Sequence, residues 1–254
     1  MNINEAHIIY FSPANHTEQV CKDIQKQLIV PSSLHNLTAH ASYYEQTFGM
    51  NDLAIFAVPS FGGRTPAIAL DKFKSIHGNH TPCILLVTYG NRAYEDTLIE
   101  LYDFVKQQGF SPIGAMAIIC EHSIMHIYGS GRPDTTDVEQ MHEYLKNLFV
   151  RLDNDTTTEI SVPGHRPYKE LKTIPMVPKA GKDCIKCGAC AIQCPMEAIH
   201  PDHPQETDTS KCISCMRCVT ICPQHARKVN PILLKGATLK LKKACETRKE
   251  IELI

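Results

Sequence analysis

Short apolar runs alternate with helix-like stretches along residues 1–150. The clearest runs are Ala6–Phe11, Asp52–Val58, Pro82–Tyr89 and Pro112–Cys120, and a weaker one lies near Ser33–Leu37. Several of these runs are almost continuously apolar, which is typical of strands covered on both faces of a sheet. We therefore expect five buried or half-buried strands.

Between these runs, apolar residues recur at helical spacing. The pattern predicts helices from about His16 to Ile29, from about Pro66 to Ile76, over Tyr94–Gln107 and over Asp134–Val150. Strands that alternate with helices favour a parallel sheet. Residues 1–150 are thus predicted to form an α/β domain with a doubly wound, five-stranded parallel sheet.

The alternation ends near residue 150, and three further segments follow. Residues 151–178 are polar or interrupted by prolines, which predicts a linker. Residues 179–232 contain a cysteine-rich repeat and predict a second, small α+β domain. Residues 233–254 predict a helical extension, because Leu239–Ile254 is charged and compatible with a helix.

Composition and charge exclude some classes of protein. The chain has 254 residues, of which 43% are hydrophobic and 21% charged, and its formal net charge is -1. These values are typical of a globular protein and do not indicate a nucleic-acid or membrane-surface partner. No apolar stretch is long enough to span a membrane, and Met1–Tyr10 lacks the features of a signal peptide. We expect a cytoplasmic protein.

The distribution of the cysteines is more informative than the overall composition. The chain has 12 cysteines, and eight of them lie between Cys184 and Cys222. In a reducing cytosol, such clustering favours a metal or redox site over disulfides. The four scattered cysteines are expected to be structural or incidental: Cys21, Cys83, Cys120 and Cys245.

The eight clustered cysteines form two runs of C-x₂-C-x₂-C-x₃-C-P, at Cys184–Pro195 and Cys212–Pro223. Three closely spaced thiolates can bind one face of a cubane [4Fe–4S] cluster. In two-cluster ferredoxins the fourth ligand comes from the other run. The assignment is then Cys184, Cys187, Cys190 and Cys222 for cluster 1, and Cys212, Cys215, Cys218 and Cys194 for cluster 2.

Residues 180–230 therefore resemble a bacterial-type 2[4Fe–4S] ferredoxin domain. The resemblance implies low-potential, one-electron transfer with no substrate bound at the clusters. Structural zinc is the alternative, but zinc sites made from C-x₂-C pairs leave the third and fourth cysteines of each run unexplained.

The loop after the first predicted strand has features of a phosphate site. Its sequence is Ser12-Pro13-Ala14-Asn15-His16-Thr17, and a helix is expected to begin there, so backbone N–H groups would suit an anion. The loop resembles the flavodoxin phosphate loop T/S-x-T-G-x-T. Ala14 removes one hydroxyl, and Asn15 replaces the glycine, which asparagine can do in a left-handed conformation. The alternative is that Ser12–Thr17 only caps the helix.

Two further loops resemble the flavin-binding loops of flavodoxins. In the first, Pro59-Ser60-Phe61-Gly62-Gly63, paired glycines allow the backbone to approach a planar ring. In the second, from Thr88 to Tyr94, Tyr89 could stack on an isoalloxazine and Gly90 and Asn91 could donate N–H groups to it. Over nearly its whole length the chain resembles a family of flavodoxin–ferredoxin fusion proteins. The resemblance implies a flavodoxin-like first domain that binds FMN.

The segment after the fifth predicted strand carries three candidate functional residues. His122 and His126 could donate protons to reduced flavin or to a bound acceptor, and they could equally be surface or hydrogen-bonded polar residues. Arg132 could face an anion or pair with Asp134 or Asp137.

We therefore expect an iron–sulfur flavoprotein that passes electrons between two [4Fe–4S] clusters and FMN. Tethering the two domains gives a high effective concentration of one redox centre near the other. The expected partners are redox proteins, either a ferredoxin-type donor or a reductase that accepts electrons, with a small-molecule acceptor as a further candidate. The alternative function is an FMN-dependent reductase of a small organic substrate beside His122. A cluster-based regulatory sensor is a third hypothesis, which no DNA-binding helix pair supports.

Overall fold

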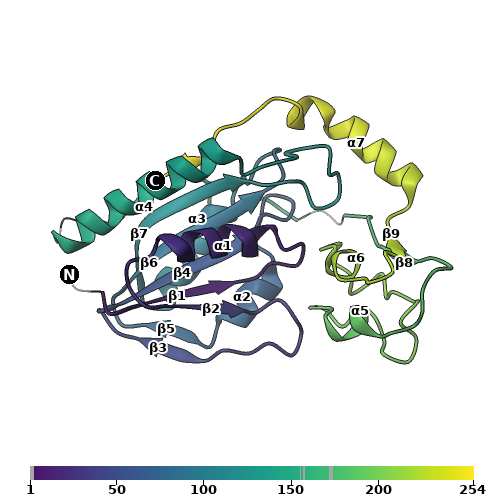
Figure 1. The fold of residues 1–254 in the computed structure, drawn as a ribbon, viewed down its shortest axis with the longest axis horizontal. Helices are drawn as coiled ribbons and strands as arrows, with labels where there is room; N and C mark the ends of the chain where they lie inside the picture. Colours follow the sequence, from purple (N-terminus) through teal and green to yellow (C-terminus); the bar gives the residue numbers. More distant parts are fainter. Residues whose placement is uncertain (1–2, 155, 157, 172–173) are drawn as a thin grey trace.

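The computed structural model describes residues 3–154, 156, 158–171 and 174–254. Residues 155, 157 and 172–173, which belong to the predicted linker, lie outside the described residues. The first domain is built on a mostly parallel sheet with the strand order β10-β7-β6-β4-β1-β2 (Figure 1). The sheet has six strands where five were expected, because a strand from the end of the chain joins it.

The five expected strands form the parallel part of the sheet. Four of them follow the apolar runs: β1 (Glu5–Tyr10), β4 (Asp52–Pro59), β6 (Thr81–Tyr89) and β7 (Phe110–Ile119). The fifth, β2 (Ser32–Asn36), is more polar and lies at the sheet edge. Because the strands are parallel, the loops after β1, β4, β6 and β7 leave from the same edge.

Helices pack on this sheet at the places that the periodicity predicts. They are α1 (His16–Gln27), α2 (Ala67–Phe73), α3 (Thr97–Gln107) and α4 (Thr135–Asp153). Figure 1 shows α1 and α4 on the face toward the viewer, and these two helices contact each other. The Asp134 and Asp137 side chains form a capping box that begins α4.

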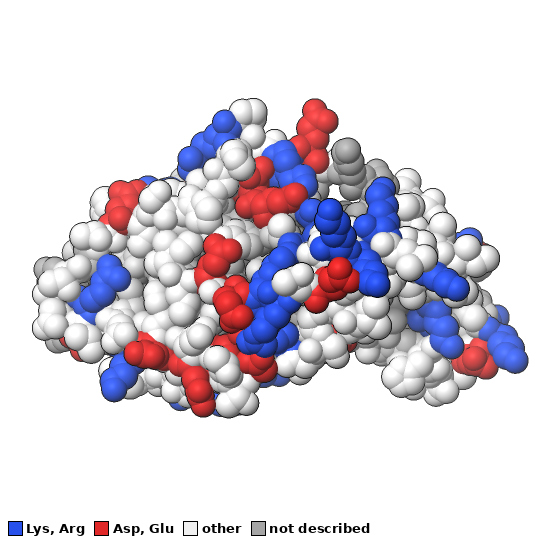
Figure 2. All heavy atoms as spheres, turned by 90° about the horizontal axis from the view of Figure 1, so that it is seen from above, with Lys and Arg blue, Asp and Glu red and all other residues white. Residues whose placement is uncertain are grey.

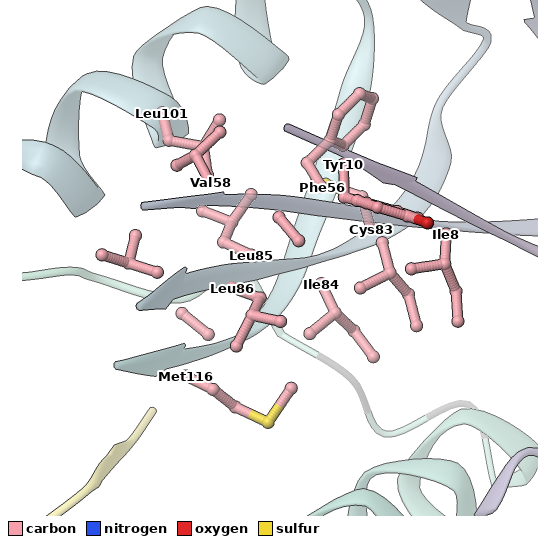
Figure 3. Close-up of a cluster of buried hydrophobic side chains, with 14 of the residues drawn as sticks. Ile8, Tyr10, Phe56, Val58, Cys83, Ile84, Leu85, Leu86, Leu101 and Met116 are labelled. Atoms are coloured by element: carbon pink, nitrogen blue, oxygen red, sulfur yellow. The ribbon is translucent and has the colours of Figure 1, made fainter. Parts of the chain in front are cut away.

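Side chains from neighbouring strands form the core of the first domain. Figure 3 shows Ile8 of β1, Phe56 of β4 and Ile84 of β6 in one cluster, and all three are fully buried. Each such side chain contributes about 1.5–3 kcal/mol of burial free energy. Cys83 lies in the same cluster, and burial raises the pKa of its thiol. It acts there as a small hydrophobe, as the sequence predicts.

Two short parallel strands in the first domain were not expected from the sequence. They are β3 (Gln46–Phe48) and β5 (Ile76–Gly78), and they pair only with each other. Their three-residue length leaves no periodic pattern to detect. The strand β5 begins where the predicted helix was expected to continue, so α2 ends at Phe73.

The second domain contains little regular structure. An antiparallel pair, β8 (Lys179–Ala180) and β9 (Arg227–Lys228), closes it, and two single-turn helices each contain the third cysteine of a run. These are α5 (Ala189–Ile192) and α6 (Arg217–Thr220), and each begins after a left-handed residue, Gly188 or Met216. Figure 1 shows this domain beside the loop edge of the sheet.

The expected helical extension is helical only in its first half. The helix α7 (Pro231–Cys245) begins at the Asn230 cap and ends at Cys245, and the chain then runs back to the first domain. There, β10 (Glu252–Leu253) pairs antiparallel with β7. The backbone N–H groups of Ala115 and Ile254 each donate to the other residue's carbonyl oxygen at 2.9 Å. The last residues have a composition compatible with a helix, but they form a strand because the edge of β7 offers backbone hydrogen-bond partners.

The described part of the linker packs on the first domain. Arg166 Nε and Tyr168 Oη both donate to Asp103 Oδ2, at 2.7 and 2.5 Å, and the Lys169 N–H donates to Asp96 Oδ2 at 2.8 Å. The Arg166 guanidinium holds the pKa of Asp103 below its usual range. The second domain is thus joined to the first through a segment with fixed contacts.

Within the described ranges, no helix is both long and apolar enough to cross a membrane.

Candidate redox site

The first group of cysteines lines a single cavity in the second domain. This cavity brings together the four residues predicted for cluster 1, Cys184, Cys187, Cys190 and Cys222. The last of them comes from the other run, so the fold crosses the two runs as the ferredoxin arrangement requires.

The thiols predicted for cluster 2 also lie close together. Burial, with a smaller contribution from the nearby Cys218, Cys194 and Cys212, raises the pKa of Cys215 to about 12. Burial likewise raises the pKa of Cys218 to about 12. Buried thiols whose thiolate forms would repel one another lose their protons only beside a positive charge. The iron atoms of a cluster supply such a charge. The residues present therefore fit two [4Fe–4S] clusters.

Backbone donors face the fourth cysteine of each run in the same way. The Ala198 N–H donates to Cys194 Sγ and the Ala226 N–H donates to Cys222 Sγ, both at 3.3 Å. Burial favours a higher pKa for Cys222, but the surrounding backbone N–H groups outweigh it and lower the pKa. Hydrogen bonds to the sulfur atoms of a cluster are one of the factors that determine its reduction potential. In the described part of the chain, no three His, Cys, Asp or Glu side chains are grouped as ligands of one metal ion.

A small cavity marks the loop edge of the parallel sheet in the first domain. Its volume is about 40 Å³, and its walls come from the loops after β1, β4, β6 and β7. Most of the predicted flavin-site residues line it: Ser12, Ala14, His16, Thr17, Pro59, Ser60, Phe61, Thr88, Tyr89 and Gly90. A cavity of this size suits a phosphate-sized group, so the rest of a flavin would lie over the loops outside it.

The hydroxyl groups of this loop have protein partners. Ser12 Oγ accepts the Glu18 N–H at 2.9 Å, which caps the first turn of α1, and Thr17 Oγ1 lies 2.8 Å from Thr88 Oγ1. Asn15 adopts the left-handed conformation expected at the glycine position, with φ of 67°. The loop therefore caps the helix, and Asn15 has the conformation expected at the glycine position.

Five residues predicted for the flavin site do not line this cavity: Asn15, described above, and Gly62, Gly63, Asn91 and Tyr94. A Cβ on Gly63 would approach Glu95 Oε2 to 1.8 Å, so this glycine makes room for Glu95, and Gly62 lies beside Leu171. Asn91 Nδ2 donates to the Cys245 carbonyl at 2.6 Å, and Tyr94 Oη donates to Glu252. The last two side chains thus bind the C-terminal segment, whose position the sequence pattern did not reveal.

The histidines differ in their surroundings. His122 is partly buried, its Nδ1 accepts the N–H groups of Ile124 and Met125, and burial lowers its pKa to about 4. His126 is exposed and its Nδ1 lies 2.6 Å from Glu121 Oε1. A neutral, accepting His122 is poorly suited to donate a proton near neutral pH from Nδ1.

Arg132 is engaged in a structural ion pair. Its guanidinium binds Asp137 through two N–H groups, with Nη2 to Oδ1 at 2.6 Å, and Nη1 donates to the Lys249 carbonyl at 3.0 Å. Arg132 was expected either to face an anion or to pair with Asp134 or Asp137, and in the structure it pairs with Asp137.

Arg217 is a site residue that the sequence analysis missed. Its Nη1 donates to Asn15 Oδ1 at 2.9 Å and its Nη2 to Gln193 Oε1 at 2.7 Å. It therefore joins the second cysteine run to the loop after β1. A signal was present in the repeat, because the corresponding position of the first run is Ala189. A second contact between the domains is His40 Nε2 to Glu197 Oε2 at 3.0 Å.

Comparison with known families matches the cluster-binding part of the chain. Residues 165–227 match the family model described as a 4Fe-4S dicluster domain. A search of curated proteins gave no match. The second domain is accordingly a 4Fe–4S ferredoxin domain suited to iron–sulfur electron transfer, and the match begins before the predicted boundary at residue 179.

Proposed function

We propose that the protein is an iron–sulfur flavoprotein that passes electrons between two [4Fe–4S] clusters and FMN. The observation that carries this proposal is the contact of Arg217 with Asn15. Arg217 lies between two predicted ligands of cluster 2, and Asn15 lies in the loop after β1. The contact therefore brings a cluster run against the proposed phosphate loop.

The topology of the first domain supports FMN as its ligand. The parallel strands follow the order β2-β1-β4-β6-β7, which corresponds to the doubly wound flavodoxin order, with β10 added at one edge. In such sheets ligands bind beyond the carboxyl ends of the strands, and the 40 Å³ cavity lies there. Ser12, Ala14 and Thr17 would hold the phosphate, while Tyr89 and Phe61 would border the ring.

In the proposed relay, the protein holds the clusters and the flavin close to each other. FMN, when bound, accepts two electrons in single steps, so it can join one-electron clusters to a two-electron acceptor. The contacts of Arg217 and His40 keep the cluster domain against the loop edge, so that transfer is intramolecular.

A reductase of a small organic substrate is the second candidate. A cavity of about 590 Å³ lies on the other side of Tyr89, and its polar lining includes Arg92, Glu95, His165 and Lys169. Convergent polar groups around a cavity are typical of a small-molecule site. Screening of reduced protein against organic acceptors would detect this activity as flavin reoxidation.

The first test is the cofactor content of anaerobically purified protein. We expect about eight iron and eight sulfide per chain with one FMN, because two four-iron clusters and one flavin account for the site. Eight iron without flavin would contradict the flavin half of the proposal and leave the cluster half standing. Zinc in place of iron and sulfide would contradict the cluster half.

A further inference from the structure

A groove of about 700 Å³ lies where the β8–β9 pair meets the start of α7. Cys212, a predicted ligand of cluster 2, forms part of its wall. Solvent therefore reaches the immediate surroundings of a cluster ligand through this groove.

The groove is positively charged. Lys179, Lys182 and Lys228 line it together with one acidic residue, Asp183. All three lysines are exposed, and the ion pairs of lysine within the described ranges involve other lysines. These three charges are thus available to a partner.

The positive charge extends beyond the groove along α7. This helix contains four lysines and no acidic residue, and Figure 2 shows Lys and Arg side chains gathered over it and toward the second domain. Apolar side chains also line the groove, among them Val177 and Leu233. A basic rim around an apolar floor is complementary to an acidic protein surface with an apolar centre.

We propose that this groove is the docking surface of a small acidic one-electron carrier protein, which delivers electrons to cluster 2. Its carboxylates would face Lys179, Lys182 and Lys228, and its own redox centre would lie near Cys212. One electron leaves the reduced carrier, which is oxidised, and reduces the cluster by one electron. No proton or bond is transferred. The inference rests on the cluster half of the proposed function and does not require FMN.

The second cysteine run then connects the two ends of the route. Cys212, at its start, lies in the groove, and Arg217, at its middle, contacts Asn15 of the first domain. Electrons that enter at the groove therefore need to cross only this run to reach the proposed flavin site.

The test compares two triple variants of the full chain by stopped-flow reduction with a reduced acidic bacterial ferredoxin. One variant reverses the groove charges, Lys179→Glu, Lys182→Glu and Lys228→Glu. The matched control makes the same charge change on α7, Lys240→Glu, Lys242→Glu and Lys243→Glu. Iron content and photoreduction by a deazaflavin, which needs no docking surface, verify that each protein is loaded. If a variant with Glu substitutions loses iron, the same positions are changed to Gln and the comparison is repeated.

We expect the groove variant to lower the second-order rate constant at low salt by about tenfold or more, within the range of electrostatic steering. Its rate should also lose most of its salt dependence, while the control changes less than the groove variant. An unchanged rate in the groove variant would overturn the proposal. An equal or larger loss in the α7 control would overturn it too, because docking would then lie on the helix. Wild-type protein without iron would instead refute the cluster half of the proposed function.

Discussion

At the scale of single residues, Arg217 links the two domains through neutral partners. Its guanidinium binds the amide oxygens of Asn15 and Gln193, and among the described residues no carboxylate lies within hydrogen-bond distance of it. Burial lowers its pKa, yet an arginine stays charged at any physiological pH. A charged donor therefore holds the loop in place, which makes this contact stronger than a neutral hydrogen bond.

We predict that Arg217→Gln slows electron transfer from the clusters to the flavin while iron, sulfide and flavin contents stay unchanged. Loss of a hydrogen bond to a charged group costs about 1.5–3 kcal/mol, which corresponds to roughly tenfold or more in the docked fraction. Laser-flash or stopped-flow kinetics would measure the internal rate. Lys186→Gln, which removes an exposed cation from the first run, is the control and should leave the rate as it is.

His122 is predicted to stay neutral throughout the physiological range. With a pKa of about 4, it binds a proton only in acid, below the ordinary histidine value. We therefore expect His122→Asn, which keeps an acceptor near the Nδ1 position, to leave the pH profile of flavin reoxidation unchanged between pH 6 and 8. A limb near pH 6.5 that disappears in the variant would show that His122 is a proton donor after all.

The same depressed pKa has a consequence for stability. In the folded protein His122 releases its proton at lower pH than in the unfolded chain, so the unfolded chain binds more protons between about pH 4 and 6.5. The contribution of His122 to folding is therefore complete above about pH 6.5 and is lost as the pH falls toward 4.

At the scale of elements, the two cysteine runs are interlocked. The cavity that contains Cys184 also contains Cys222, and the thiols near Cys215 include Cys194. Each run thus contributes to both proposed clusters, and neither run can hold a complete cluster by itself.

We predict that Cys222→Ser and Cys187→Ser perturb the same cluster, and that Cys194→Ser and Cys215→Ser perturb the other. Electron paramagnetic resonance of the dithionite-reduced variants would show two matching pairs of spectra, because each pair removes a ligand from one cluster. If Cys222→Ser instead matched Cys215→Ser, the crossed assignment would be wrong.

Sequence patterns predict elements well where burial is continuous. The apolar runs of β4, β6 and β7 and the amphipathic helices α1 and α3 lie within a few residues of their predicted positions. The 4Fe–4S domain was equally visible, because the spacing of its cysteines is local in the chain. What was missed depends on distant partners: β10 has two residues, Glu252 and Leu253, and only the edge of β7 makes them a strand. Arg217 and Tyr94 likewise have partners more than 150 residues away.

At the scale of the whole molecule, the ferredoxin domain is attached to the first domain at both ends. The linker side is fixed through Arg166 and Tyr168 on Asp103, and the C-terminal side through β10 on β7. Tyr144 Oη also donates to the Ile254 carbonyl. Two attachments restrict the domain more than one flexible tether would, and this restriction would keep the proposed clusters at the loop edge.

We predict that both attachments must be loosened before internal electron transfer slows strongly. An insertion of about ten Gly and Ser residues after Leu171 makes a flexible tether, and deletion of residues 231–254 removes β10 together with α7 and the contacts of Cys245 and Lys249 on the first domain. Either change alone should slow cluster-to-flavin transfer only slightly, whereas both together should slow it by about 10²-fold, the scale of a lost effective concentration. A full loss from the insertion alone would mean that β10 does not hold the domain.

The return of the chain to β7 also sets an order of events during synthesis. Chains emerge from the ribosome N-terminus first, and domains generally fold as units as they emerge. The first domain is an exception, because its sixth strand is made of Glu252 and Leu253, near the very end of the chain. All eight clustered cysteines therefore leave the ribosome before that sheet can be completed. The proposed clusters could then be inserted while the ferredoxin domain is still held at one end only, before β10 pairs with β7.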